Sequence, residues 1–304
     1  MTASAESPRS EYQRHGVVVL RGVLAPHEVD LLREGIDAVV ANPSPRAKVA
    51  SAPDDPGFFI EDFCTWRDHP AFESVIRTSR LATVAAELMG SRTVTLYHDH
   101  ILVKEPGTRQ RTPWHQDQPY YDVEGVQNVS FWIPVDPVSR EDCLEVIAGT
   151  HRGPWLMPRS FLDQQAKWFP EGSLTEMPNY DAERSAHTIV SADLQPGDCI
   201  AFHMLAVHGA PGVSGPNRRR VFSLRLLGDD MVFAPRDWTT SPEMTAVFDG
   251  PDSRVSGEPL TGDWFPACSD PPPDTLIGIP TGFRGRGVRG RGSWWGPRGD
   301  PRGR

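Results

Sequence analysis

The sequence predicts a mainly β fold, a sandwich or barrel of short strands, with N-terminal α-helices packed on one side. Two observations support this prediction. Apolar residues recur at helical spacing within the first 90 of the 304 residues. From residue 93 onward, apolar and polar residues instead alternate in many short segments that turns separate. Strands that follow a helical region in this way are typical of such a two-layer fold.

Two helices are expected in the N-terminal region, after a short strand at 16–21 (GVVVLR). Pro26 favours the start of the first helix, because the N–H that proline lacks would have no partner there. The apolar face of this helix repeats at helical spacing: Val29, Leu32, Ile36 and Val39. The second helix is expected to run from about Pro70 to Gly90, which is a favourable C-terminal residue.

The strand region begins at 93–104 (TVTLYHDHILVK). Strict alternation would place six of its residues on one face: Val94, Leu96, His98, His100, Leu102 and Lys104. Further strands are expected at 112–118, 126–136, 143–148, 186–191, 198–203 and 219–227. Residues 154–185 interrupt this series with several aromatic side chains, and a long segment of this kind within a domain predicts a lid or a substrate wall.

The bulk composition favours a reduced cytoplasmic protein. The four Cys are scattered and form no CxxC pair, which argues against a disulfide scaffold. We expect no signal peptide, since the N-terminus lacks a charged and an apolar region. No apolar run approaches the roughly 20 residues of a membrane span, so no membrane partner is expected.

The net charge of −9 is unevenly distributed. Residues 283–304 contain seven Arg and one Asp, a net charge of +6, so the rest of the chain carries −15. Such an acidic body makes nucleic acid an improbable main partner. The segment 271–304 is rich in Pro, Gly and Arg and is expected to be disordered. Its Arg-Gly sequence with aromatics could bind single-stranded nucleic acid weakly, but a solvated extension is the simpler interpretation.

Three residues favour a metal site. His115 and Asp117 are two positions apart, so on a strand their side chains would point to the same face. His208 follows the apolar segment AFHMLAV and precedes a glycine. Two His and one carboxylate suit a non-haem Fe(II) that keeps other positions open for a co-substrate and O2. His98 and His100 could instead bind a metal, but no third ligand is found for them.

Seven segments occur in a specific order and spacing: YQRHGVVVLRGVLAPHEVDLLREGID, HILVKEPGT, PWHQDQPYY, FWIPVD, CLEVIAGTHRG, LQPGDCIAFHMLAVHGA and NRRRVFSLRLLGDD. Together they resemble the phytanoyl-CoA dioxygenase family of Fe(II)/2-oxoglutarate oxygenases, from about residue 10 to 235. The resemblance implies a double-stranded β-helix (jelly-roll, cupin-like) core with the helices on one side. It also implies one oxygenase domain over 1–270, followed by the tail 271–304.

The resemblance assigns the three metal-ligand roles to His115, Asp117 and His208, and makes these the catalytic residues. It places Arg219 where the distal carboxylate of 2-oxoglutarate would bind, and a planar guanidinium suits that role. Alternation puts Arg225 on the same face, so Arg225 could assist. Two further arginines are expected to face solvent: Arg218 and Arg220.

Further co-substrate contacts are expected from three residues: His100, Gln116 and Trp132. Trp132 could equally be a core residue. In one respect the sequence departs from the family, which often has a hydroxyl two positions after the second His ligand. Here that residue is Ala210. The co-substrate would then lose one hydrogen bond, or another group such as Ser223 would supply it.

The implied reaction is hydroxylation of a small organic molecule, with release of succinate and CO2. An Asp at position 117 argues against halogenation, because related halogenases keep that coordination position open for chloride. Desaturation, epimerisation or ring closure of a secondary metabolite are alternatives. The substrate wall is expected to include the segment 55–67, the 154–185 segment and four aromatic residues: Phe59, Trp66, Tyr120 and Tyr121.

Two other classes of protein remain possible at this point. A non-catalytic jelly-roll binding protein would fail to bind 2-oxoglutarate. A Zn²⁺-dependent hydrolase using the same ligands would act without O2 or 2-oxoglutarate.

Overall fold

The computed structural model describes residues 6–52, 54–157, 172–242, 244 and 255–269. The expected tail at 271–304 and part of the 154–185 segment lie outside these residues. Four α-helices occur in the described part of the chain: α1 (Pro8–His15), α2 (Pro26–Ala41), α3 (Pro70–Thr78) and α4 (Leu81–Met89). Within the same part, no helix has the length and apolar character that a membrane crossing requires.

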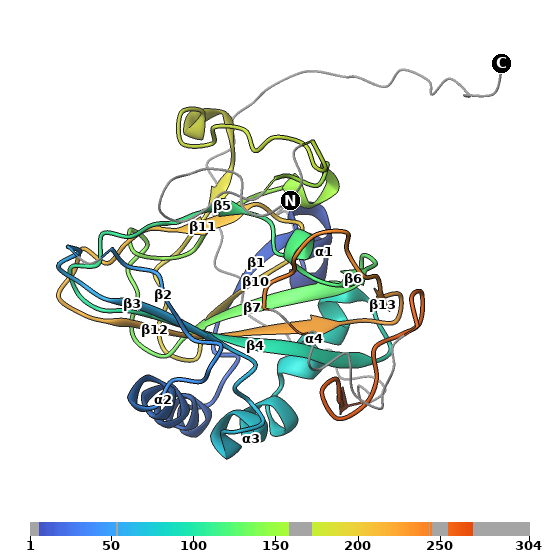
Figure 1. Cartoon of the computed structure of the whole chain (residues 1–304), viewed down its shortest axis with the longest axis horizontal. Coiled ribbons are helices and arrows are strands. Elements are labelled where there is room, and N and C mark those ends of the chain that lie inside the picture. The colour runs from blue at the N-terminus through green and yellow to red at the C-terminus, as the bar shows by residue number, and fades with distance from the viewer. Residues whose placement is uncertain (1–5, 53, 158–171, 243, 245–254, 270–304) are drawn as a thin grey trace, which may run out of the picture.

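Two antiparallel sheets form the jelly-roll core and face one another (Figure 1). The larger sheet is built from β1 (Val17–Leu20), β10 (Cys199–Phe202), β7 (Asn128–Pro134), β12 (Arg219–Leu227), β4 (Val94–Lys104), β3 (Phe59–Phe63) and β2 (Lys48–Val49), in that order, with β14 (Ala267–Ser269) also paired to β4. The smaller sheet has the order β5 (Thr112–His115), β11 (His208–Ala210), β8 (Glu145–Ile147) and β9 (Ile189–Val190). A two-stranded ribbon joins β6 (Val123–Glu124) to β13 (Val232–Phe233).

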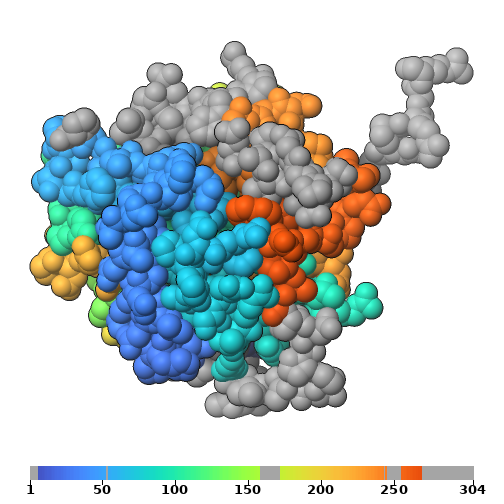
Figure 2. Space-filling view, turned by 60° about the horizontal axis from the view of Figure 1, so that its bottom comes forward, coloured from blue at the N-terminus to red at the C-terminus, as the bar shows by residue number. Residues whose placement is uncertain are grey.

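The helices cover the outer face of the larger sheet, and a second core fills the space between the sheets. Alternate residues of β12 separate these environments: Phe222 and Leu224 pack with α2, α3 and α4, whereas Val221 packs between the sheets. Figure 2 shows the helical side of the molecule, where these blue and cyan elements lie beside the orange segment 255–269. The pocket described below therefore lies on the inner face, away from the helices.

A β-bulge in β4 overturns the expected single face of residues 93–104. Arg225 of β12 pairs with His98, but the next residue of β12 pairs with Leu96, so β4 contains one extra residue at this point. Leu96 consequently packs on the helical side, in the same core as Ile101. Of the six residues predicted to share one face, only those after the bulge lie on the inner face of the sheet.

Two other expectations differ from the structure. The single helix expected at 70–90 is two helices, because Ser79 adopts an extended conformation between them. Arg220, expected to face solvent, has a side chain that is only 12% exposed and forms ion pairs with Asp37 of α2 and with Asp136. This arginine therefore ties the first long helix to the larger sheet.

Helix α2 approaches α3 closely at Gly35. A methyl group at this position would lie 2.3 Å from Cε1 of Phe72, a ring that is fully buried. The Phe72 ring packs against Phe222, with 4.9 Å between ring centroids, so it has little freedom to move aside. The small side chain at residue 35 is thus required by the contact between the two helices.

We predict that Gly35→Ala destabilises the fold by about 1–3 kcal/mol through overpacking, although alanine favours a helix by about 1 kcal/mol. Phe72→Leu makes room for the methyl group, so the two substitutions together should cost less than the sum of their separate effects. Chemical denaturation of the four proteins in this double-mutant cycle measures the coupling. A stabilising Gly35→Ala would contradict the predicted contact.

Candidate metal centre

The candidate metal centre forms where β5 pairs with β11. His115 and His208 are direct partners across these antiparallel strands, and their ring centroids lie 4.1 Å apart. Asp117 Oδ1 is 3.7 Å from His115 Nε2 and 3.5 Å from His208 Nε2. One ligand atom of each residue lies within 4.8 Å of the other two, which is close enough for a single metal ion.

Asp117 reaches this position from a turn and not from a strand. Strand β5 ends at His115, and Asp117 has a helical backbone conformation just before the short 3-10 helix at 118–120. Its N–H donates to the carbonyl of Met204, at 2.7 Å, and so does the N–H of Gln118, at 3.0 Å. The expected strand alternation is therefore not the cause of the convergence: the turn before β11 fixes the carboxylate.

Backbone carbonyls determine which imidazole nitrogens are available. His115 Nδ1 lies 2.8 Å from the Pro113 carbonyl, and His208 Nδ1 lies 2.9 Å from the Ala206 carbonyl. A carbonyl oxygen only accepts hydrogen bonds, so each Nδ1 donates in the neutral imidazole and each Nε2 keeps its lone pair. Both lone pairs belong to the nitrogens that lie closest to Asp117, as metal binding requires.

The carboxylate of Asp117 is held in its ionised form. Burial opposes ionisation, but the guanidinium of Arg225 holds the pKa of Asp117 well below its usual value. Arg225 Nη2 lies 3.3 Å from Oδ2, and the Ser130 hydroxyl donates to the same oxygen at 2.9 Å. Oδ2 is thus occupied by protein groups, while Oδ1 faces the two imidazoles.

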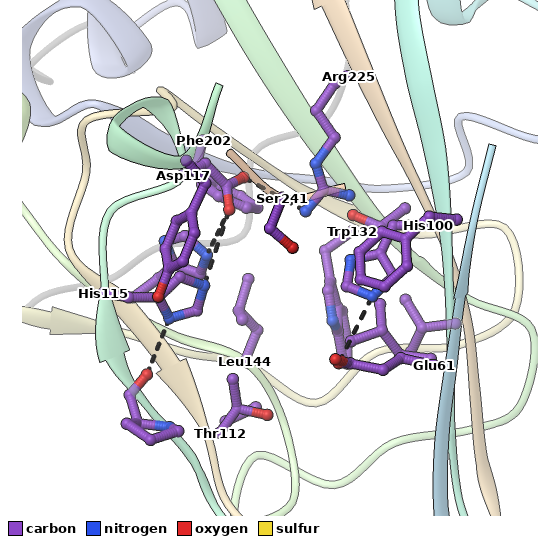
Figure 3. A pocket seen from close by; sticks show the side chains of 18 of the residues that line it. Glu61, His100, Thr112, His115, Asp117, Trp132, Leu144, Phe202, Arg225 and Ser241 are labelled. Atoms are coloured by element: carbon purple, nitrogen blue, oxygen red, sulfur yellow. Dashed lines mark hydrogen bonds and ion pairs between the residues drawn. The ribbon is translucent and has the colours of Figure 1, made fainter. Parts of the chain in front are cut away.

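A pocket opens beside the three residues, between the two sheets (Figure 3). The residues that line it come from both sheets and from the segments between strands: Glu61, Phe63, His100, Leu102, Thr112, Pro113, His115, Asp117, Tyr120, Tyr121, Trp132, Leu144, Phe202, His208, Ala210, Arg219, Val221, Ser223, Arg225 and Ser241. Most of this lining is apolar or aromatic. A few charged groups therefore dominate the electrostatics of the pocket.

Two buried basic side chains lie side by side at one end of the pocket, and burial lowers the pKa of Lys104 well below its usual value. Arg219, which lines the pocket, is paired across strands with Lys104. Arg219 donates to the carbonyls of Asp142 and Pro211, and Lys104 donates to the carbonyl of Gln110, at 2.8 Å, and to that of Pro211, at 3.0 Å. These acceptors carry no charge. Burial lowers the pKa of Arg219 to about 10, so the guanidinium remains protonated at neutral pH.

Of the residues proposed from the sequence for co-substrate binding, His100 and Trp132 line the pocket together with Arg219. Gln116 is fully buried outside it. Its amide NH2 donates to the carbonyls of Leu205, at 2.9 Å, and Pro154, at 3.2 Å, and its oxygen accepts from the Leu156 N–H at 2.8 Å. Gln116 therefore ties the metal motif to two neighbouring segments and does not point at a co-substrate.

Of the four aromatic residues expected to contact the substrate, two line the pocket and two do not. Tyr120 and Tyr121 line the pocket, whereas Phe59 and Trp66 are not among its lining residues. Phe59 is fully buried, and Lys104 Nζ lies 4.4 Å from the centroid of its ring. Trp66 packs in the core beside the helices. Both are large aromatic residues near a functional segment, and the sequence alone does not separate such residues from core residues.

Glu61 and Phe63 line the pocket and belong to the segment 55–67 that was expected to form part of the substrate wall, although neither residue was singled out there; Ser241 also lines the pocket and was not expected. Alternation along β3 (FIEDF) could have indicated Glu61, because it places this carboxylate on the same face as Phe59 and Phe63. The 154–185 segment contributes none of the lining residues in its described part, 154–157 and 172–185. Ser241 comes from a segment distant from the motifs and had no such signal.

A family model described as phytanoyl-CoA dioxygenase (PhyH) matches residues 12–221, which is more than two thirds of the sequence. The chain belongs to the phytanoyl-CoA dioxygenase family. A probable phytanoyl-CoA dioxygenase of Caenorhabditis elegans is 27% identical over 187 residues, which cover 57% of this chain and 54% of that relative. This family member therefore spans about half the length of that curated relative.

Solved structures show the same fold. The non-haem alpha-ketoglutarate-dependent epimerase SnoN from nogalamycin biosynthesis has a TM-score of 0.68 at 21% identity, covering 88% of this chain and 97% of SnoN. The carbocyclase SnoK from the same biosynthesis has a TM-score of 0.66 at 21% identity, covering 88% and 96%. Another structure of SnoN is a complex with Fe3+, alpha-ketoglutarate and nogalamycin RO. At this identity the likeness concerns the fold alone.

His203 stabilises the turn that holds Asp117. The N–H of Leu205 donates to His203 Nδ1 at 3.0 Å, so this nitrogen accepts, and Nε2 lies 3.0 Å from the Val126 carbonyl, to which it donates. The bond from Leu205 requires the neutral imidazole, because a protonated Nδ1 cannot accept. Burial lowers the pKa of His203 to about 4, from an ordinary value of 6.5.

We predict that acidification destabilises the protein through His203. Its pKa is lower in the folded state than in the unfolded state, so the unfolded chain binds the proton first, and stability falls as the pH drops from about 6.5 toward 4. Between pH 7 and pH 5 this group should lower the free energy of unfolding by about 2 kcal/mol. Denaturation of wild type and His203→Gln at both pH values measures the difference. Equal losses in the two proteins would contradict the assignment.

Proposed function

We propose that this chain is a non-haem Fe(II)- and 2-oxoglutarate-dependent oxygenase that hydroxylates a small organic molecule and releases succinate and CO2. The main support is one observation: the metal-binding atoms of His115, Asp117 and His208 converge beside a pocket that also contains the buried Arg219. Membership of the phytanoyl-CoA dioxygenase family agrees with this proposal. Epimerisation and ring closure with the same cofactors are the alternative outcomes, because the structural neighbours SnoN and SnoK are named an epimerase and a carbocyclase.

The donor set fits Fe(II). Two neutral imidazole nitrogens and one carboxylate oxygen would occupy one face of the ion and leave other positions open. Ser130 and Arg225 hold the second carboxylate oxygen, so Asp117 would bind through Oδ1 alone. When bound, iron and 2-oxoglutarate supply the oxidising chemistry with O2. The residues around them position the reactants and exclude water from the pocket.

The buried Arg219 fits the distal carboxylate of 2-oxoglutarate. Arg219 presents a planar guanidinium to the pocket, 5.7 Å from the ring centroid of Trp132, and this shape suits a carboxylate. Thr112 can supply the hydroxyl that Ala210 lacks, because the two residues are partners across β5 and β11. The Thr112 oxygen accepts from Lys104 Nζ at 3.3 Å, which leaves its own O–H free to donate.

The first test is an anaerobic titration of the metal-free protein with Fe(II) and 2-oxoglutarate, followed through the visible charge-transfer band of the chelate. We expect the band in the wild type and its loss in His115→Ala and Asp117→Ala, because iron loses a ligand in each variant. His27→Ala is the control, since His27 is exposed on α2. A folded wild-type protein without a band would refute the proposed function.

A second prediction concerns Arg219. Replacement by Gln should raise the dissociation constant of 2-oxoglutarate by about 10- to 100-fold, the effect of losing a hydrogen bond between charged groups. Affinity for Fe(II) should stay unchanged. Arg218→Gln is the matched control, because Arg218 pairs with Glu105 on the exposed surface. The same titration gives the 2-oxoglutarate constant when 2-oxoglutarate is varied at saturating Fe(II), and the Fe(II) constant when Fe(II) is varied at saturating 2-oxoglutarate. An unaffected Arg219→Gln would move the role to another cation.

A further inference from the structure

The side of the pocket opposite the metal ligands contains a second polar pair. Glu61 of β3 and His100 of β4 lie across the cavity from His115 and Asp117 (Figure 3). The side chain of Glu61 is 8% exposed and that of His100 is 12% exposed, so both belong to the interior of the pocket and not to its rim. The proposed iron site uses neither group, and the role assigned to His100 below replaces the co-substrate contact expected from the sequence.

The His100 ring is fixed in place with an unsatisfied nitrogen. Phe63 stacks on it, with 4.0 Å between centroids and 20° between planes. His100 Nε2 is buried and has no hydrogen-bond partner among the described residues, and it lies 3.6 Å from Glu61 Oε2, beyond hydrogen-bonding distance. Burial lowers the pKa of His100, which favours the neutral imidazole. The pair therefore offers carboxylate oxygens and an imidazole nitrogen to the same part of the cavity.

The other charges of the pocket have different roles. Arg225 forms an ion pair with Asp117 through Nη2, while its Nη1 has no hydrogen-bond partner among the described residues, and Arg219 lies beside Lys104. A ligand group that reaches Glu61 therefore meets a buried negative charge next to a neutral ring. Burying an anionic group there would be unfavourable, while a group with N–H or O–H donors would satisfy the acceptors.

We propose that Glu61 and His100 form the substrate-recognition site of this enzyme, and that they bind a hydroxyl or protonated amino group of an otherwise largely apolar small molecule. This inference rests on the proposed function, because it takes the metal side of the pocket to be the reaction centre. The apolar part of the molecule would lie against Phe63, Leu102 and Tyr120. A substrate carboxylate placed next to Glu61 would be disfavoured.

The test uses three probes with one carbon skeleton: cyclohexylmethanol, cyclohexylmethylamine and cyclohexanecarboxylate. Ligand-observed NMR measures their binding to the anaerobic full-length protein with Fe(II) and 2-oxoglutarate. We expect the alcohol and the amine to bind to the wild type and the carboxylate not to bind. Glu61→Gln should weaken the amine at least about tenfold and the alcohol less, because the amide oxygen still accepts a hydrogen bond. Glu61→Leu should abolish binding of both.

Glu124→Gln is the matched control, since Glu124 is exposed outside the pocket, and it should bind the probes like the wild type. The charge-transfer band separates the two proposals: its presence in Glu61→Leu, with probe binding lost, supports the recognition site. A missing band in the wild type would instead refute the proposed function. Binding of the carboxylate, failure of all three probes, or unchanged binding in Glu61→Leu would overturn the role of Glu61 and His100.

Discussion

The antiparallel pairing of β5 with β11 is the interaction on which the candidate site depends. It places His115 directly opposite His208, although 92 residues separate them in the sequence. The turns that flank these strands are also bonded to each other, because the Met204 carbonyl accepts from two N–H groups of the Asp117 turn. Backbone hydrogen bonds in a short sheet thus fix three side chains to within the dimensions of one metal ion.

The buried charged side chains in and beside the pocket are organised in three groups. Asp117 is ionised in the interior because Arg225 and Ser130 contact its second oxygen. Arg219 and Lys104 are held by neutral carbonyls, which orient both side chains and leave the guanidinium charge of Arg219 available to an anion. Glu61 lies on the remaining side with His100. Because the interior has a low dielectric constant, these groups impose a strong electrostatic preference on each part of the pocket.

The larger sheet supports these groups by dividing its residues between two cores. On β12, Phe222 and Leu224 anchor the strand against the helices, while Arg219 and Arg225 point into the pocket from the other face. The bulge in β4 shifts its alternation by one residue. His98 and His100, after the bulge, lie on the inner face, whereas Leu96, before it, packs against the helices. The helical layer therefore contributes to the site indirectly, by fixing the sheet that presents it.

The sequence by itself determined the fold class, most of the strands, the three candidate ligands and the candidate carboxylate-binding Arg219. These depend on local periodicity and on motifs whose order is specific. The bulge in β4, the break at Ser79 and the inward position of Glu61 were decided by tertiary packing. Gln116, Phe59 and Trp66 show the same limit, because which side chain reaches the pocket depends on contacts between segments distant in sequence. Local patterns do not encode those contacts, and only the assembled sheets bring them about.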